Sequence, residues 1–198
     1  MRVAFIGAHG VGKTTLAEQV ARWTALPHIT ERARTVAEDW GLTPATIPAN
    51  RLVEYQWAIL NAQISAENDW HHLGFLSDRS TIDNQAYMLA HVQNTNGNLA
   101  LVRNYAEEAM QRLGHYDRLF YLPIRFPLPT DDPARHPDTA FQRQIDALIP
   151  QIIDVVSLWY VPGFWTRVHT VHSLSVADRV SEVLRVLEAD EKKLYVVS

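Results

Sequence analysis

A stretch of nine residues near the start of the chain, GAHGVGKTT at positions 7–15, directly follows a short apolar run at residues 2–6. Its spacing is Gly7-x-x-x-x-Gly12-Lys13-Thr14. Glycines can adopt positive φ and have no β-carbon, so other groups can approach the backbone closely. Successive N–H groups can then line an anion-binding hollow at the positive end of the following helix. The stretch therefore predicts a strand, a phosphate-cradling loop and a helix, in that order.

The alternative reading of this stretch is a glycine-rich turn without a ligand. Leu16, Val20 and Trp23 recur at helical spacing after the loop, and this context favours a nucleotide site. Lys13 is expected to reach the terminal phosphates, and the Thr14 hydroxyl to help hold Mg²⁺. We expect ATP and Mg²⁺ to bind here. The loop residues expected to contact them are Gly7, His9, Gly10, Val11, Gly12, Lys13, Thr14 and Thr15.

Composition limits the class of protein. The chain has 198 residues, 47% of them hydrophobic and 20% charged, with a formal net charge of -4. These values are typical of one soluble globular domain and argue against a large basic nucleic-acid surface, although they leave room for a local basic groove. The absence of cysteine excludes disulfides and thiolate chemistry. With neither a signal peptide nor a membrane-length apolar run in the sequence, we expect a cytoplasmic protein with no membrane partner.

Strand-like and helix-like patterns alternate along the chain. Strands are expected at residues 2–6, 26–30, 74–80, 116–124 and 167–172, and helices at 32–40, 51–70, 82–91, 99–113, 139–160 and 176–187 in addition to the one after the loop. Such alternation predicts an α/β fold with a parallel sheet covered on both faces. Ligands of such sheets lie at the carboxyl ends of the strands.

Charged side chains follow several of the predicted strands. Glu31 comes after the second strand, Asp78 and Arg79 after the third, and a charged, proline-rich loop with Arg135 after the fourth. If these strand ends meet, phosphate donors, carboxylates and an arginine share one crevice. That set of groups suits phosphoryl transfer, which needs positioning, charge neutralisation and a carboxylate to accept a proton.

Four segments, GAHGVGKTT, ITERAR, FLSDRSTIDNQAYML and YDRLFYLP, resemble the P-loop kinases of the nucleoside and nucleotide kinase group. The most similar branch contains AAA-like nicotinamide riboside kinases and deoxynucleoside kinases. The resemblance implies a three-layer P-loop NTPase fold with a five-stranded parallel sheet in the order 2-3-1-4-5. It also implies a single kinase domain over residues 1–188, a lid at about 127–143 and a tail at 189–198.

The same resemblance implies roles for individual residues. Lys13 matches the phosphate-binding lysine, while Thr14 and Asp78 would serve the metal. Arg79 would orient the acceptor, and Glu31 lies where deoxynucleoside kinases keep their general base, although Asp78 remains an alternative base. The lid would add Arg135 as a catalytic residue and Arg143 as an ATP-binding residue. The helix with Tyr55, Gln56 and Gln63 would flank the acceptor pocket.

Simpler structural roles compete with some of these assignments. Glu31 and Asp78 are alternatively helix caps, because acidic residues are favoured at helix starts. The pairs His71-His72 and His169-x-x-His172 lack the cysteines or paired carboxylates that would complete a metal site, so packed or solvated histidines are favoured. The six tryptophans are expected in the core or in a pocket wall.

The favoured function is an ATP-dependent kinase whose acceptor is a nucleoside, a nucleotide or a related small molecule. One alternative is a kinase acting on a hydroxymethylated pyrimidine or an end within DNA, which would use a basic groove. The overall negative charge argues against that alternative. A second alternative is a P-loop ATPase switch, for whose sensor segments this length leaves little room. The oligomeric state stays open.

Overall fold

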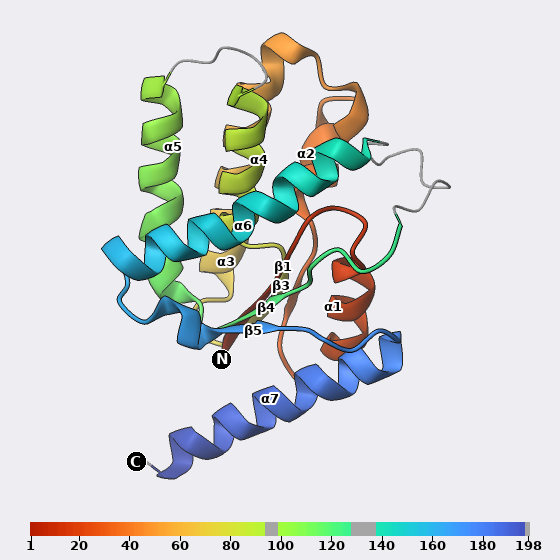
Figure 1. Cartoon of the computed structure of the whole chain (residues 1–198), viewed down its shortest axis with the longest axis vertical. Helices are drawn as coiled ribbons and strands as arrows, with labels where there is room; N and C mark the ends of the chain where they lie inside the picture. The colour runs from red at the N-terminus through yellow and green to blue at the C-terminus, as the bar shows by residue number, and fades with distance from the viewer. Residues whose placement is uncertain (94–98, 128–137, 197–198) are drawn as a thin grey trace.

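The computed structural model describes residues 1–93, 99–127 and 138–196 (Figure 1). Most of the predicted lid, with Arg135, lies outside the described residues. The strands are β1 (Arg2–Ile6), β2 (His28–Ile29), β3 (Phe75–Asp78), β4 (Arg118–Tyr121) and β5 (Val168–Thr170). The helices are α1 (Lys13–Ala21), α2 (Arg32–Asp39), α3 (Leu52–Asp69), α4 (Thr81–Gln93), α5 (Leu99–Gln111), α6 (Thr139–Trp159) and α7 (Val176–Val196).

The five strands form one sheet in the order β2-β3-β1-β4-β5, and every neighbouring pair is parallel. The predicted fold class and strand order are confirmed. The central strand β1 is an uninterrupted apolar run from Val3 to Ile6, all of it buried. Such a run is expected where helices cover both faces of a parallel strand.

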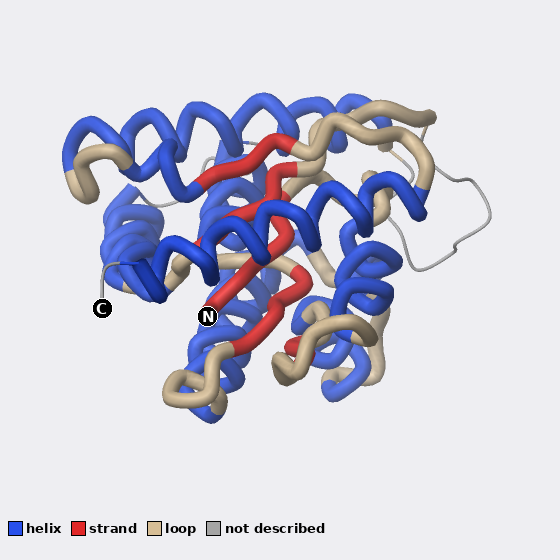
Figure 2. Tube along the Cα trace, turned by 90° about the horizontal axis from the view of Figure 1, so that it is seen from below, coloured by secondary structure: helices blue, strands red, loops and turns tan. Residues whose placement is uncertain are grey.

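Helices lie on both sides of the sheet (Figure 2). Helices α1 and α7 pack together, and α3, α4, α5 and α6 form a second packed group. The main core lies between these helices and the strands, with Phe5 stacked on Phe120 at 5.5 Å between ring centroids. Because all strands run the same way, their carboxyl ends meet at one edge, where the loop of residues 7–12 follows β1, Glu31 follows β2 and Asp78 ends β3.

Helix α7 is longer than the sequence pattern predicts. It runs to Val196 and so continues through most of the expected tail. Good helix formers extend the helical period past Leu187. The helix is also anchored to the sheet, because Arg118 of β4 donates from Nε and Nη2 to the Asp190 carboxylate at 2.7 and 2.6 Å. Both partners are largely shielded from solvent, which limits screening of this ion pair.

The expectation that the tryptophans are buried is wrong for several of them. Trp23 is 73% exposed just beyond the end of α1, and Trp159 is 79% exposed at the end of α6. A helical period that is read one turn too far assigns such terminal residues to the apolar face.

Two further properties bear on the class of protein. None of the helices in the described part of the chain is long and apolar enough to cross a membrane.

The histidines of the predicted pair His71-His72 contact each other, with ring centroids 5.6 Å apart, and His71 also contacts His115 at 5.2 Å. Among the described residues, no three or more His, Cys, Asp or Glu side chains come together in a way that could hold a metal ion.

Candidate active site

The glycine-rich loop joins β1 to α1 and has the backbone shape that its sequence predicts. Gly7 has φ +149°, and a β-carbon there would lie 2.5 Å from the carbonyl oxygen of Leu122. Gly12, the N-cap of α1, is left-handed with φ 91°. Residues with a β-carbon would be strained at both positions, so the loop requires glycine in these places.

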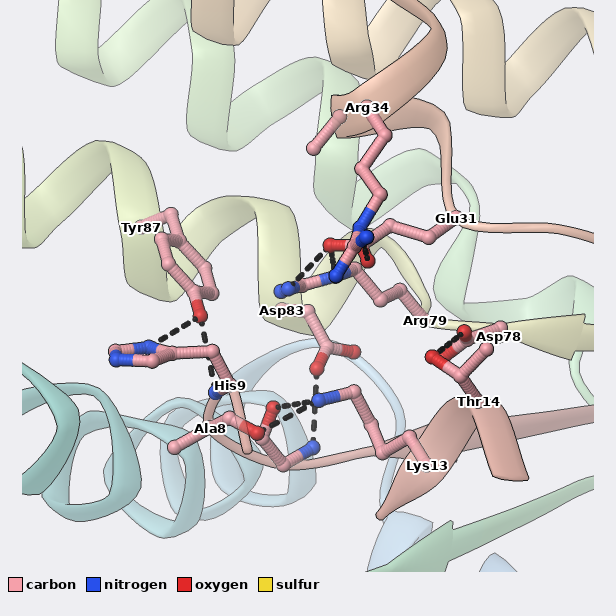
Figure 3. Close-up of polar contacts among 12 residues, drawn as sticks. Ala8, His9, Lys13, Thr14, Glu31, Arg34, Asp78, Arg79, Asp83 and Tyr87 are labelled. Atoms are coloured by element: carbon pink, nitrogen blue, oxygen red, sulfur yellow. Dashed lines mark hydrogen bonds and ion pairs between the residues drawn. The ribbon is translucent and has the colours of Figure 1, made fainter. Parts of the chain in front are cut away.

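Lys13 begins α1 and turns back over the loop (Figure 3). Its Nζ donates to the carbonyl oxygens of Gly7 and Ala8 at 2.8 and 2.7 Å. Burial, together with a smaller effect of the Arg79 guanidinium, lowers the pKa of Lys13 to about 8 against the opposing effect of nearby carboxylates. The ammonium group is therefore held inside the loop, where a phosphate would offer it an anionic partner.

Thr14 and Asp78 form an oxygen-rich pair beside the loop. The Thr14 hydroxyl donates to Asp78 Oδ2 at 2.6 Å. The other carboxylate oxygen, Oδ1, is buried and has no hydrogen-bond partner among the described residues. Hydroxyl and carboxylate oxygens are the ligands that Mg²⁺ prefers, and Mg²⁺ usually takes only one or two from the protein. The two residues thus fit the predicted magnesium site.

Glu31 and Arg79 form a shielded ion pair on the other side of Lys13. Arg79 donates from Nε to Glu31 Oε1 at 2.7 Å, and Arg34 lies 3.6 Å from Oε2. Burial raises the pKa of Glu31, but Arg79 and Lys13 outweigh it and hold the pKa below its usual value. Glu31 occupies the N-cap position of α2 and makes no capping hydrogen bond, so its carboxylate serves the ion pair and not the helix start.

The backbone of Arg79 is unusual. It has φ 91°, the only positive φ outside glycine in the described part of the chain. Its N–H donates to the Phe5 carbonyl of β1 at 3.0 Å, which continues the sheet pairing for one residue beyond Asp78. A non-glycine residue in this region costs of order 1–3 kcal/mol and persists where the surroundings impose it. The turn directs the guanidinium toward Glu31 and not along the strand.

Asp83 and Tyr87 also belong to the site, although the sequence analysis did not identify them. Asp83 is fully buried and accepts from the backbone N–H of Gly7 at 3.0 Å and of Ser80 at 2.9 Å. Burial raises the pKa of its carboxyl group. The Tyr87 hydroxyl bonds His9. Their four-residue spacing directly after the DRS segment places both on one helix face, and this was the available signal.

One cavity connects these groups. It encloses about 960 Å³ of empty space, its open mouth included. Its walls combine loop residues with side chains from α2, α3, α4 and α6. They are His9, Gly10, Gly12, Lys13, Thr14, Thr15, Glu31, Ala33, Arg34, Pro44, Tyr55, Gln56, Ile59, Arg79, Asn84, Tyr87, His91 and Phe141. The Nδ2 of Asn84 is buried and has no hydrogen-bond partner among the described residues, so a ligand could satisfy this donor.

Most of the predicted site residues converge on this cavity. Lys13, Thr14, Glu31 and Arg79 line it, and Asp78 adjoins it through Thr14. Arg143 is exposed on α6, where its Nε donates to the Thr139 carbonyl at 3.2 Å. Two of the three residues expected to flank the acceptor pocket, Tyr55 and Gln56, line the cavity, whereas the Gln63 amide donates to Glu67 and Ser77.

Helix α7 supports the loop from its other side. Arg179 donates from Nη1 to the Val11 carbonyl and from Nε to the Ser173 carbonyl, each at 2.9 Å. Glu182, one turn further, accepts from the backbone N–H groups of His172 and Ser173 at 3.0 and 2.9 Å. The loop after β5 and the glycine-rich loop are thereby fixed to the same helix.

Several solved structures share this fold at low sequence identity. Deoxyadenosine kinase from M. mycoides, with the products dCMP and dCDP bound, has a TM-score of 0.70 and 12% identity, covering 96% of this chain and 100% of that one. Thymidylate kinase from Candida albicans has a TM-score of 0.67 and 14% identity, covering 96% and 91%. NadR in complex with NR has a TM-score of 0.65 and 16% identity, covering 91% and 50%.

No curated protein matches the sequence significantly. A family model described as an AAA domain matches residues 2–161, which include the glycine-rich loop and four of the five strands. The fold resemblance to nucleoside and nucleotide kinases, expected from the sequence, is confirmed. The chain belongs to the AAA domain family of P-loop proteins.

Proposed function

We propose that this protein is a kinase that transfers the γ-phosphate of ATP to a small nucleoside or nucleotide acceptor. The observation that carries the proposal is the single cavity that joins the glycine-rich loop to the Glu31–Arg79 pair. A phosphate-binding loop and an arginine–carboxylate pair in one cavity provide a donor side and an acceptor side. The fold likeness to deoxyadenosine and thymidylate kinases supports the same reading.

On the donor side, Lys13 would leave the carbonyl oxygens that now hold it and bind the terminal phosphates of ATP. The backbone N–H groups of the loop would cradle the same phosphates. Thr14 and Asp78 would hold Mg²⁺, which neutralises phosphate charge when bound. A more distant donor contact by Arg143, or by Arg135 outside the described residues, stays a prediction.

On the acceptor side, Arg79 would hold the acceptor by charge. Glu31 is ionised at neutral pH, and its carboxylate is the group that would accept a proton from a hydroxyl acceptor. The apolar and aromatic side chains of Ile59 and Phe141 and the amides of Gln56 and Asn84 line the same cavity. Flat apolar surface with a few amide groups suits a heterocyclic base.

The test is phosphate transfer from radiolabelled ATP. Purified protein would be assayed with deoxyadenosine, thymidine monophosphate, nicotinamide riboside and DNA with hydroxymethylated pyrimidines, with the Lys13→Ala variant as control. The proposal expects label on a small acceptor, and only with the wild-type protein. Label on DNA alone would favour the polynucleotide kinase. ATP hydrolysis at full rate without any acceptor would favour the ATPase.

A further inference from the structure

Helix α4 carries two side chains that hold the glycine-rich loop, one helical turn apart (Figure 3). Asp83 accepts from the N–H of Gly7, and Tyr87 contacts His9. Because residues four apart lie on one face of a helix, both contacts come from the same stripe of α4. The loop is therefore held in place by α4 as well as by α1, the helix that follows it.

His9 is contacted by side chains of two helices, α4 and α6. Its N–H donates to the Tyr87 oxygen at 3.1 Å, and its Nδ1 lies 3.0 Å from the same oxygen. A tyrosine hydroxyl can accept one bond and donate another, so one group serves both contacts when Nδ1 carries no proton. The His9 carbonyl accepts from Gln142 Nε2 of α6 at 2.7 Å. The backbone at His9 thus takes its position from α4 and α6.

The ring of Tyr87 faces the acceptor side. The Arg79 guanidinium carbon lies 4.7 Å from its centroid, within the range of a cation–π contact. The same guanidinium donates to Glu31. One buried side chain therefore contacts the loop through its hydroxyl, and it contacts the acceptor arginine through its ring and through a hydrogen bond of the same hydroxyl.

From this geometry we infer that Tyr87 is a positioning residue that keeps the ATP-binding loop and Arg79 in a fixed relative placement. The inference rests on the proposed function, because it takes ATP as the ligand of the loop. The hydroxyl restrains His9 and hydrogen-bonds Arg79, and the ring supports the guanidinium group. Phenylalanine retains the ring contact and loses only the contacts of the hydroxyl.

The first experiment measures ATP affinity by calorimetry in the presence of Mg²⁺. Tyr87→Phe is expected to weaken binding about three- to tenfold, the usual scale for one lost hydrogen bond. The matched control is Tyr121→Phe, which loses a bond of 2.9 Å to Asp146 outside the cavity and should bind ATP normally. Thermal unfolding of each variant separates loss of placement from loss of fold.

A double-mutant cycle then tests whether the hydroxyl acts through His9. The effect of Tyr87→Phe on ATP affinity should be smaller in a His9→Ala background than in the wild type, because the two changes remove a shared contact. His9→Ala keeps the backbone N–H bond to Tyr87 and removes only the imidazole contact, so the effect should be reduced but not abolished. If the two effects simply multiply, the hydroxyl does not act through the His9 imidazole and the inference fails in this form.

The second experiment needs no ligand. Solvent exchange of the Arg79 Nε–H, which donates to Glu31, is followed by ¹⁵N NMR. Tyr87→Met removes both the ring and the hydroxyl and should speed this exchange at least about threefold, whereas Tyr87→Phe keeps the ring and should speed it less. Unchanged exchange in Tyr87→Met, or normal ATP affinity in Tyr87→Phe, would overturn the inference. If the wild-type protein bound no ATP, the proposed function itself would fail first.

Discussion

The Thr14 hydroxyl donates to Asp78 Oδ2 at 2.6 Å, although 64 positions separate the two residues in the chain. Thr14 lies in the first turn of α1, and Asp78 ends the neighbouring strand β3. The parallel pairing of β1 with β3 brings them together, with Phe5 opposite Asp78. This relationship leads to a prediction about magnesium.

Asp78→Asn is expected to raise the Mg²⁺ concentration needed for half-maximal ATP binding by about tenfold or more, because an amide oxygen is a weaker ligand than a carboxylate. Calorimetric titrations of ATP at several Mg²⁺ concentrations measure this. The control is Asp117→Asn, which disturbs an ion pair with Arg2 at the other end of the strands. Equal Mg²⁺ dependence in both variants would remove Asp78 from the metal site.

Lys13→Ala should lower phosphate transfer at least about 10²-fold, the scale for removal of one preorganised charge-stabilising group. The wild-type protein should also bind ATP more weakly as the pH rises above about 8, where Lys13 loses its proton in the free protein. Lys13→Ala lacks this group and should show no such decline. ATP affinity of the wild-type protein and of the variant, measured from pH 7 to 10, tests this pH dependence. A decline of equal size in the variant would contradict the assignment of the decline to Lys13.

Glu31→Gln distinguishes a hydroxyl acceptor from a phosphate acceptor. Loss of the general base should lower turnover about 10²-fold or more for a hydroxyl acceptor, and much less for a phosphate acceptor, which needs no base.

The Glu31→Gln variant should also be less stable than the wild-type protein. Because the pKa of Glu31 is lowered in the folded protein, its contribution is present above its ordinary pKa of 4.5 and fades as the pH falls below it. The denaturant midpoints of the two proteins should therefore differ less at pH 3.5 than at pH 7.

Glu182 should govern stability in acid. Burial raises its pKa, but hydrogen bonds from Ser173, His169 and His172 outweigh that effect and lower the pKa to about 2. Its stabilising contribution is therefore complete above its ordinary pKa of 4.5 and is lost as the pH falls toward 2. Glu182→Gln should unfold at lower urea concentration than the wild type at pH 6, and the difference should shrink by pH 2.5. A difference independent of pH would contradict the lowered pKa.

Arg79→Gly and Arg79→Ala remove the same guanidinium but differ in the backbone that they tolerate. At φ 91°, alanine is strained and glycine is not. The glycine variant should be about 1 kcal/mol more stable than the alanine variant, although glycine lacks the methyl group with which alanine could pack. Urea unfolding measures this difference. Equal stability would mean that the backbone relaxes when the arginine is lost.

The sequence carried enough information for the fold because its strongest signals are local. The glycine-rich loop, the apolar strands and the acid–arginine pair after β3 are each readable within a few residues. Parallel topology then places the carboxyl ends of the strands at one edge of the sheet, so Lys13, Glu31 and Arg79 could be expected in one cavity.

Contacts that depend on helix rotation could not be predicted in the same way. The spacing of Asp83 and Tyr87 places them on one face of a helix, but the packing of α4 against the loop is what shows that this face contacts the loop. The length of β2 could not be predicted from the sequence either. The strand contains only His28 and Ile29, because it lies at the edge of the sheet and pairs with a single neighbouring strand.

The left-handed backbone of Arg79 also restricts which substitutions this position can accept. The turn favours glycine, or asparagine, aspartate and histidine among residues with a side chain, and none of them carries a permanent positive charge at neutral pH. Lysine keeps a charge but not the planar fork that meets Glu31. The replacements that relieve the backbone strain lose the permanent positive charge, and lysine, which keeps a charge, keeps the strain. No single substitution satisfies both demands, so adaptation to a new acceptor would have to alter the surrounding walls before it altered this residue.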